Sequence, residues 1–129
     1  MANPDNTLPD FEDADLAERV EHISAEDVNR LSFGAIRLDS GGKVTVFNDA
    51  EHRLSGYGKQ ASGRIFFTEI APCMNNPNFR GRIERAMATG KLDIRFGHVG
   101  DFNDLSRELA VRVQSVSGGG CWIFLQRED

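Results

Sequence analysis

The chain has 129 residues and a formal net charge of −5, with 15 basic and 20 acidic side chains. This length predicts one domain with a substantial core, and the scattered basic residues argue against nucleic acid or an anionic membrane as a direct partner. No apolar run approaches the roughly 18 residues that would cross a bilayer, and the acidic N-terminus lacks a signal-peptide core, so we expect a cytoplasmic protein.

The first 31 residues predict an arm and a small helical cap. Residues 1–10 contain two prolines and little to bury. Apolar residues at helical spacing then predict a short amphipathic helix, which carries Leu16, Val20 and Ile23. Ser24 and Asp27 resemble a capping box that opens a second helix. We therefore divide the chain into a cap, 1–31, and a core, 32–129, although an ordinary solvated helix pair fits the first part equally well.

Alternating apolar residues predict five strands in the rest of the chain. These strands carry Ile36 and Leu38, Val44 and Val46, Leu92 to Phe96, Leu109 to Val113, and Cys121 to Leu125. A helix with Asn48 as its N-cap follows the second strand, and another helix begins at Pro77 and buries Phe79, Ile83 and Met87. A mobile loop is expected at 97–104. Strands that flank a helical insert predict an α+β fold of the PAS type, a five-stranded antiparallel sheet with helices on one face and the N-terminal cap.

Cys73 lies in the most distinctive stretch of the chain, directly after Pro72. Asn76 and Pro77 predict a helix start just beyond it, and a helix N-terminus favours the thiolate form of a nearby cysteine. An inert core cysteine fits the same residues. Cys73 and Cys121 match no metal-binding spacing, so we interpret both as reduced thiols, with a disulfide left open.

Four segments together resemble the photoactive yellow protein family. They are Ser32–Asp39, Phe47–Glu51, Ile70–Phe79 and Cys121–Phe124. The similarity runs from about Phe33 to the C-terminus and more loosely through the N-terminal helices. Members of this family are small blue-light receptors with a PAS fold, so the resemblance implies a photoreceptor in sensory transduction and not an enzyme.

The resemblance also implies a pigment and a proton donor. Cys73 matches the cysteine that carries p-coumaric acid (4-hydroxycinnamic acid) as a covalent thioester, made from an activated donor such as p-coumaroyl-coenzyme A. Glu51 matches the buried acid that gives its proton to the pigment's phenolate after trans–cis isomerisation, which starts partial unfolding. Burial raises the pKa of such an acid and makes its anion costly. Spacing alone suggests instead that Glu51 completes a capping box with Asn48, and both roles remain compatible.

The expected pocket departs from the family at two positions. Its residues are Ile36, Phe47, Ser55, Tyr57, Phe66, Ile70 and Phe96. Phe47 replaces a tyrosine that hydrogen-bonds the phenolate, and Tyr57 stands where an arginine often covers the ring. Losing a hydrogen bond to a charged group costs about 1.5–3 kcal/mol, which is about one or two pKa units. We therefore expect a raised pigment pKa and a partly protonated dark state, with Ser55 as a substitute donor.

The loop after the third strand differs as well. His98, Phe102 and Asp104 stand where the family has aromatic residues and a methionine. Since that methionine is thought to help the pigment return to its dark isomer, Asp104 predicts slow recovery. His98 is a candidate for proton exchange near neutral pH.

Two other functions remain open on the sequence. The first is a PAS interaction or ligand-binding module that has lost the pigment, and the second is a thiol-based sensor that uses Cys73 or Cys121. For the photoreceptor we expect a monomer or weak dimer that signals to a separate, unidentified protein by non-covalent contact.

Overall fold

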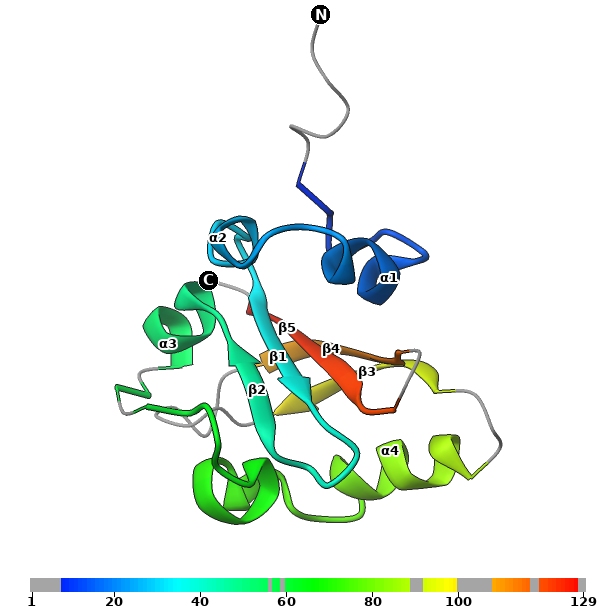
Figure 1. Ribbon diagram of the computed structural model, residues 1–129. Coiled ribbons are helices and arrows are strands. Elements are labelled where there is room, and N and C mark those ends of the chain that lie inside the picture. Colours follow the sequence, from blue (N-terminus) through cyan, green and yellow to red (C-terminus); the bar gives the residue numbers. More distant parts are fainter. Residues whose placement is uncertain are drawn as a thin grey trace, which may run out of the picture.

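A five-stranded antiparallel sheet forms the centre of the computed structural model (Figure 1). The structure describes residues 8–55, 57–58, 60–88, 92–99, 108–116 and 119–127, and for Cys73 the backbone alone. The strands are β1 (Gly34–Leu38), β2 (Val44–Phe47), β3 (Asp93–Val99), β4 (Glu108–Ser115) and β5 (Cys121–Arg127). Their order across the sheet is β2-β1-β5-β4-β3, so the last strand of the chain lies in the middle. The expected α+β architecture is confirmed.

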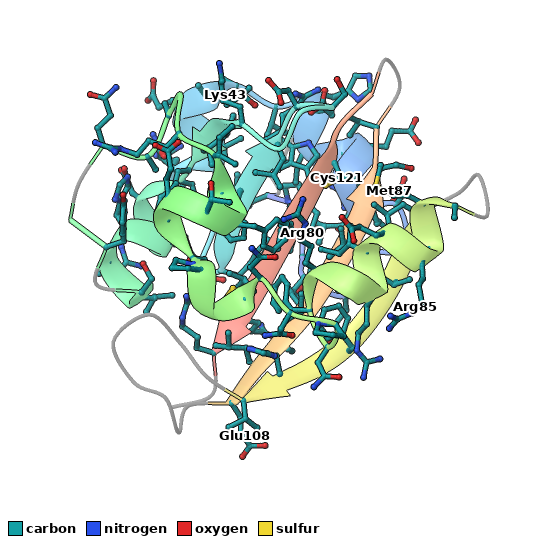
Figure 2. The ribbon with its side chains drawn as sticks, turned by 90° about the horizontal axis from the view of Figure 1, so that it is seen from below. Lys43, Arg80, Arg85, Met87, Glu108 and Cys121 are labelled. Atoms are coloured by element: carbon teal, nitrogen blue, oxygen red, sulfur yellow. The ribbon has the colours of Figure 1, made fainter. Side chains whose placement is uncertain are left out.

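The chain between β2 and β3 covers one face of the sheet (Figure 2). It forms α3 (Asp49–Ser55), the π-helical turn η2 (Phe66–Ile70), the 3-10 turn η3 (Pro72–Met74) and α4 (Arg80–Met87). Apolar residues of these elements pack against the alternate strand residues that point to this side, including Ile36, Val111 and Ile123. We call this packing the helix-side core. No helix in the described ranges has the length and apolar character that crossing a membrane requires.

The N-terminal elements pack on the opposite face and form a second core, the cap-side core. The two helices are α1 (Leu16–Glu21) and α2 (Ala25–Val28). Because side chains alternate along a strand, Trp122 and Phe124 point to the cap while their neighbours in β5 point to the helix-side core. Arg112 on β4 adds polar contacts, donating to the carbonyl oxygens of Phe11 and Asp13, each at 2.6 Å.

Two of the three helices with a predicted N-cap residue begin where the sequence predicted. The Ser24 hydroxyl accepts from the Asp27 N–H at 3.1 Å, and the Asn48 side chain accepts from the Glu51 N–H at 3.0 Å. At the third, the expected capping contact forms but the helix begins later. The Asn76 side chain accepts from the N–H groups of Asn78 and Phe79, but these residues form a turn ahead of the helix, and α4 begins at Arg80 and not at Pro77.

Two further expectations are corrected. Met87, predicted to be buried, is 47% exposed because it is the last residue of α4, whereas Ile83 one turn earlier is buried. Residues 97–99, predicted to belong to a loop, continue β3 and pair with β4, His98 facing Leu109. The backbone pairing with β4 therefore extends the strand past Gly97.

Asn48 joins the cap to the core. This fully buried side chain accepts from the N–H groups of Ala35 and Glu51 and donates to the carbonyl oxygens of Val28 and Phe33, at 2.9 to 3.2 Å. One amide thus links α2, β1 and α3.

We predict that Asn48→Ala lowers the free energy of unfolding by about 3 kcal/mol or more, since it leaves several buried backbone groups without partners. Urea unfolding followed by circular dichroism measures the change. The matched control is Asn29→Ala, because exposed Asn29 makes a similar single contact to the Asp49 N–H at 3.0 Å and its removal should cost below about 1 kcal/mol. Equal losses in the two variants would contradict the linking role of Asn48.

Candidate functional site

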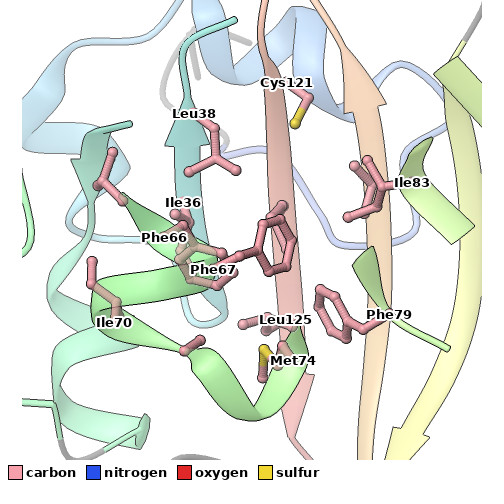
Figure 3. Packing of buried hydrophobic residues seen from close by; sticks show 14 of the residues in the cluster. Ile36, Leu38, Phe66, Phe67, Ile70, Met74, Phe79, Ile83, Cys121 and Leu125 are labelled. Carbon is pink, nitrogen blue, oxygen red and sulfur yellow. The ribbon is translucent and has the colours of Figure 1, made fainter. Parts of the chain in front are cut away.

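The helix-side core gathers the residues predicted to line a pocket. Ile36, Phe66 and Ile70 are buried members of it, as is Phe47 at its margin. Tyr57 and Phe96 are partly buried and pack against it. Figure 3 shows the side chains of η2 facing those of β1 and β5 across this core. The predicted wall residues therefore lie together, although their contact with a ligand stays a prediction.

Cys73 lies in the η3 turn at the edge of this core. The turn is closed by a hydrogen bond from the Met74 N–H to the Ala71 carbonyl oxygen at 2.9 Å. Ala71 and Met74 are fully buried in the helix-side core, so they hold the backbone of Cys73 against it. Since α4 begins only at Arg80, the predicted helix-dipole effect on Cys73 loses its structural basis.

Glu51 is fully buried and binds Arg127 through both carboxylate oxygens. Nη1 of Arg127 donates to Oε1 and Nη2 donates to Oε2, each at 2.9 Å. The Arg127 side chain is 2% exposed, so the ion pair is shielded from water. Gly34 on β1 makes room for it, because a Cβ atom there would overlap Oε1 of Glu51.

This geometry bears differently on the two roles considered for Glu51, that of a capping-box residue and that of a buried proton donor. The backbone of Glu51 is capped by Asn48, but the Asn48 N–H donates to the Ala35 carbonyl oxygen at 3.1 Å, so the carboxyl does not complete a reciprocal capping box. An arginine stays charged in proteins, and a fork with two accepting oxygens is the arrangement of a carboxylate. The contact with Arg127 thus favours the ionised form of Glu51.

Arg127 is the site residue that the sequence analysis missed. Cys121, Ile123 and Leu125 point into the helix-side core, and the period of two places Arg127 on the same face of β5. A basic residue at a core-facing strand position indicates a buried acidic partner. The alternation of core-facing side chains along β5 was therefore the sequence signal that could have identified Arg127.

Ser55 and its neighbours close the end of α3. The Ser55 hydroxyl donates to the Glu51 carbonyl oxygen at 2.5 Å and accepts from the Tyr57 N–H at 3.1 Å. The ring of Phe47 lies 4.5 Å from that of His52 and 5.7 Å from that of Tyr57, measured between centroids. Ser55 is thus committed to the backbone, which does not favour its predicted use as a substitute donor.

The predicted loop residues divide into two groups. His98 lies in β3 with its ring edge-on to Phe79, 5.1 Å between centroids. Burial lowers the pKa of His98, which favours the neutral form of its ring. Phe102 and Asp104 lie outside the residues that the structure describes.

Cys121 is a free, buried thiol in β5. Burial raises the pKa of Cys121 to about 11, against an ordinary value of 9.0. Since the thiolate is the reactive form, Cys121 is poorly suited to redox sensing.

Comparisons with known proteins agree on one family. The chain is 34% identical over 119 residues to the photoactive yellow protein of Halochromatium salexigens, covering 91% of this chain and 95% of that protein. It is 32% identical over 119 residues to that of Rhodothalassium salexigens, with the same coverage. No protein-family model matches the chain.

Solved structures give the same result. The photoactive yellow protein domain of the sensor histidine kinase Ppr from Rhodospirillum centenum superposes with a TM-score of 0.74 at 35% identity, covering 83% of this chain and 96% of that domain. A PAS domain from Colwellia psychrerythraea superposes with a TM-score of 0.62 at 15% identity, covering 81% and 92%, which supports the fold alone.

We predict that Cys121 resists alkylation while the protein is folded. In a Cys73→Ala variant at pH 8, iodoacetamide should modify Cys121 at least about 100-fold more slowly than in urea, because a pKa raised by two units lowers the thiolate fraction by that factor. Mass spectrometry of timed samples gives both rates. Similar rates in the two conditions would show that Cys121 is accessible and reactive.

Proposed function

Because the chain belongs to the photoactive yellow protein family, we propose that it is a blue-light photoreceptor that carries p-coumaric acid as a thioester on Cys73. The observation that supports this most strongly is a fully buried Glu51 carboxyl on α3, which packs on the same side of the sheet as the apolar core bordering the Cys73 turn. An aromatic acid needs apolar walls for its ring and one polar group for its phenol oxygen. The side chains of this site fit both requirements.

Cys73 provides the attachment point in this proposal. Its thiolate sulfur bonds to the carbonyl carbon of an activated p-coumaroyl donor and displaces the donor's thiol, coenzyme A, which a separate ligase had joined to the acid. When bound, the pigment supplies a double bond that isomerises in light and a phenol oxygen that can carry negative charge. Ile36, Phe66, Ile70 and Phe96 would form its walls.

Glu51 is the proposed proton donor to that phenol oxygen. After illumination Glu51 gives up its proton and is left as a buried carboxylate, a form that this site accommodates beside Arg127. Proton loss strengthens the attraction between Glu51 and Arg127, so it favours a shift of α3 relative to β5.

The N-terminal cap is the proposed responding part. Its helices have six and four residues and are too short to be stable alone. Asn48 connects α2 to the first turn of α3, so a shift of α3 strains the contact that holds the cap. Partial unfolding there would expose a surface for a separate signalling protein. We propose a cytoplasmic protein, monomeric or weakly dimeric, without enzymatic activity.

A PAS module without pigment is the second candidate, and Phe47 favours it because a family hydroxyl is missing at that position. The thiol-sensor candidate is weakened for Cys121 by its raised pKa.

Reconstitution tests the proposal directly. We expect p-coumaroyl anhydride to give a coloured adduct whose mass increases by one p-coumaroyl group and which bleaches in light. Cys73→Ala should abolish the adduct, while Cys121→Ala, the matched control, should retain it. Failure of the wild-type thiol to acylate, or an adduct that does not respond to light, would favour the pigment-free PAS module.

We further predict that Phe47→Tyr increases the ionised fraction of the bound pigment at pH 6. The new hydroxyl donates to the phenolate and should lower the pigment's apparent pKa by about one or two units. Absorbance titration of the two reconstituted proteins measures the shift. A wild-type pigment that is fully ionised at pH 6, unchanged by the substitution, would refute the predicted effect of Phe47.

A further inference from the structure

We propose that Arg127 is a positioning residue that holds the carboxylate form of Glu51 and so sets which of two groups, Glu51 or the pigment's phenol, carries their shared proton. This inference rests on the proposed function. In this proposal Arg127 acts on the pigment's chemistry through Glu51.

The contacts of the pair support this role. Two parallel hydrogen bonds of 2.9 Å join the guanidinium to both oxygens of Glu51, and both side chains are almost completely buried. Charge-assisted, bidentate contacts are the strongest hydrogen bonds in proteins, and burial reduces the screening of the charges. The geometry therefore favours an ionised Glu51 over a neutral one.

Other charged or titratable side chains near α3 either contact groups other than the Glu51 carboxyl or are exposed. His52 on the same helix lies against the ring of Phe47 and contacts the Tyr57 carbonyl oxygen through Nδ1 at 2.7 Å. Arg37 on the adjacent strand β1 is paired with Glu21 at 2.6 Å, towards the cap. Asp49 is exposed. Among the described residues, the charged side chain that directly contacts the Glu51 carboxyl is Arg127.

One proton shared between two groups has two arrangements. In the first, Glu51 is a carboxylic acid and the phenol oxygen is ionised; in the second, Glu51 is a carboxylate and the phenol is neutral. The total charge is the same in both, so the contact from Arg127 to Glu51 selectively stabilises the second. Phe47 acts in the same direction, because it offers no hydrogen bond to an ionised phenol. Together these residues favour a neutral phenol and a shorter-wavelength dark absorption.

The contact also bears on the state formed by light. Proton transfer from Glu51 produces a carboxylate whose partner is already buried next to it. The transfer is therefore easier in this chain than it would be in the same site without Arg127, and the resulting state should persist longer.

The test compares reconstituted wild type with Arg127→Gln and Arg127→Lys. In the pH range where Glu51 and the phenol together hold one proton, the ratio of the long-wavelength to the short-wavelength absorption band reports which of the two groups carries it. We expect Arg127→Gln to raise this ratio by at least about 10-fold, since it removes two charge-assisted hydrogen bonds from the carboxylate. Arg127→Lys keeps the charge without the fork and should give an intermediate ratio. A purely structural role for Arg127 would lower stability without changing this ratio.

A second measurement uses the protein without pigment. The carboxyl carbon of ¹³C-labelled Glu51 should resonate as a carboxylate at pH 6 in wild type and as a carboxylic acid in Arg127→Gln. Arg37→Gln is the matched control, because it removes a guanidinium from the opposite face of the sheet and should leave the resonance unchanged. If Arg127→Gln does not fold, Arg127→Lys must still show a carboxylate signal shifted from that of wild type.

The outcomes separate the two proposals. A neutral Glu51 in the pigment-free wild type, or an unchanged resonance and band ratio in the folded Arg127 variants, overturns the role of Arg127 alone. Failure of the pigment to attach overturns the proposed function, while the resonance of Glu51 still tests its pairing with Arg127.

Discussion

A buried ion pair between α3 and β5 is the constraint on which the candidate site depends. Glu51 and Arg127 lie on elements that are far apart in sequence, and each would be very costly in the interior without the other. A buried ion pair of this kind adds little to stability compared with apolar residues, but breaking it is strongly destabilising. The main effect of the pair is on position, because it fixes the Glu51 carboxyl next to Gly34, at the margin of the helix-side core.

The central position of β5 connects this site to the cap. Ile123 and Leu125 belong to the helix-side core, whereas Trp122 and Phe124 belong to the cap-side core. The indole N–H of Trp122 also donates to Glu21 of α1 at 2.5 Å. A displacement of β5 or α3 thus changes contacts on both faces of the sheet. This continuity is a physical hypothesis for how a proton movement at Glu51 reaches the cap, and Asn48 offers a second route.

Much of the fold could be predicted because its signals are local. Period-two alternation located all five strands, and side-chain capping located α2 and α3. The errors had two causes. The start of α4 is shifted by a local turn that Asn76 closes, whereas the end of β3 depends on long-range pairing with β4. Arg127 was missed for the same reason, since its partner lies 76 positions earlier in the chain. Cys73 and Glu51 became candidate site residues through the family resemblance, because their spacing alone allowed ordinary structural roles, and their functions stay predictions.

Light-induced proton loss from Glu51 is the central claim, and infrared difference spectroscopy tests it most directly. The reconstituted protein is labelled with ¹³C-glutamate and excited in its long-wavelength band. The account predicts loss of a protonated-carboxyl band and gain of a carboxylate band, both sensitive to the label and both absent in Glu51→Gln. A difference spectrum without carboxyl bands, or one that is unchanged in Glu51→Gln, would contradict it.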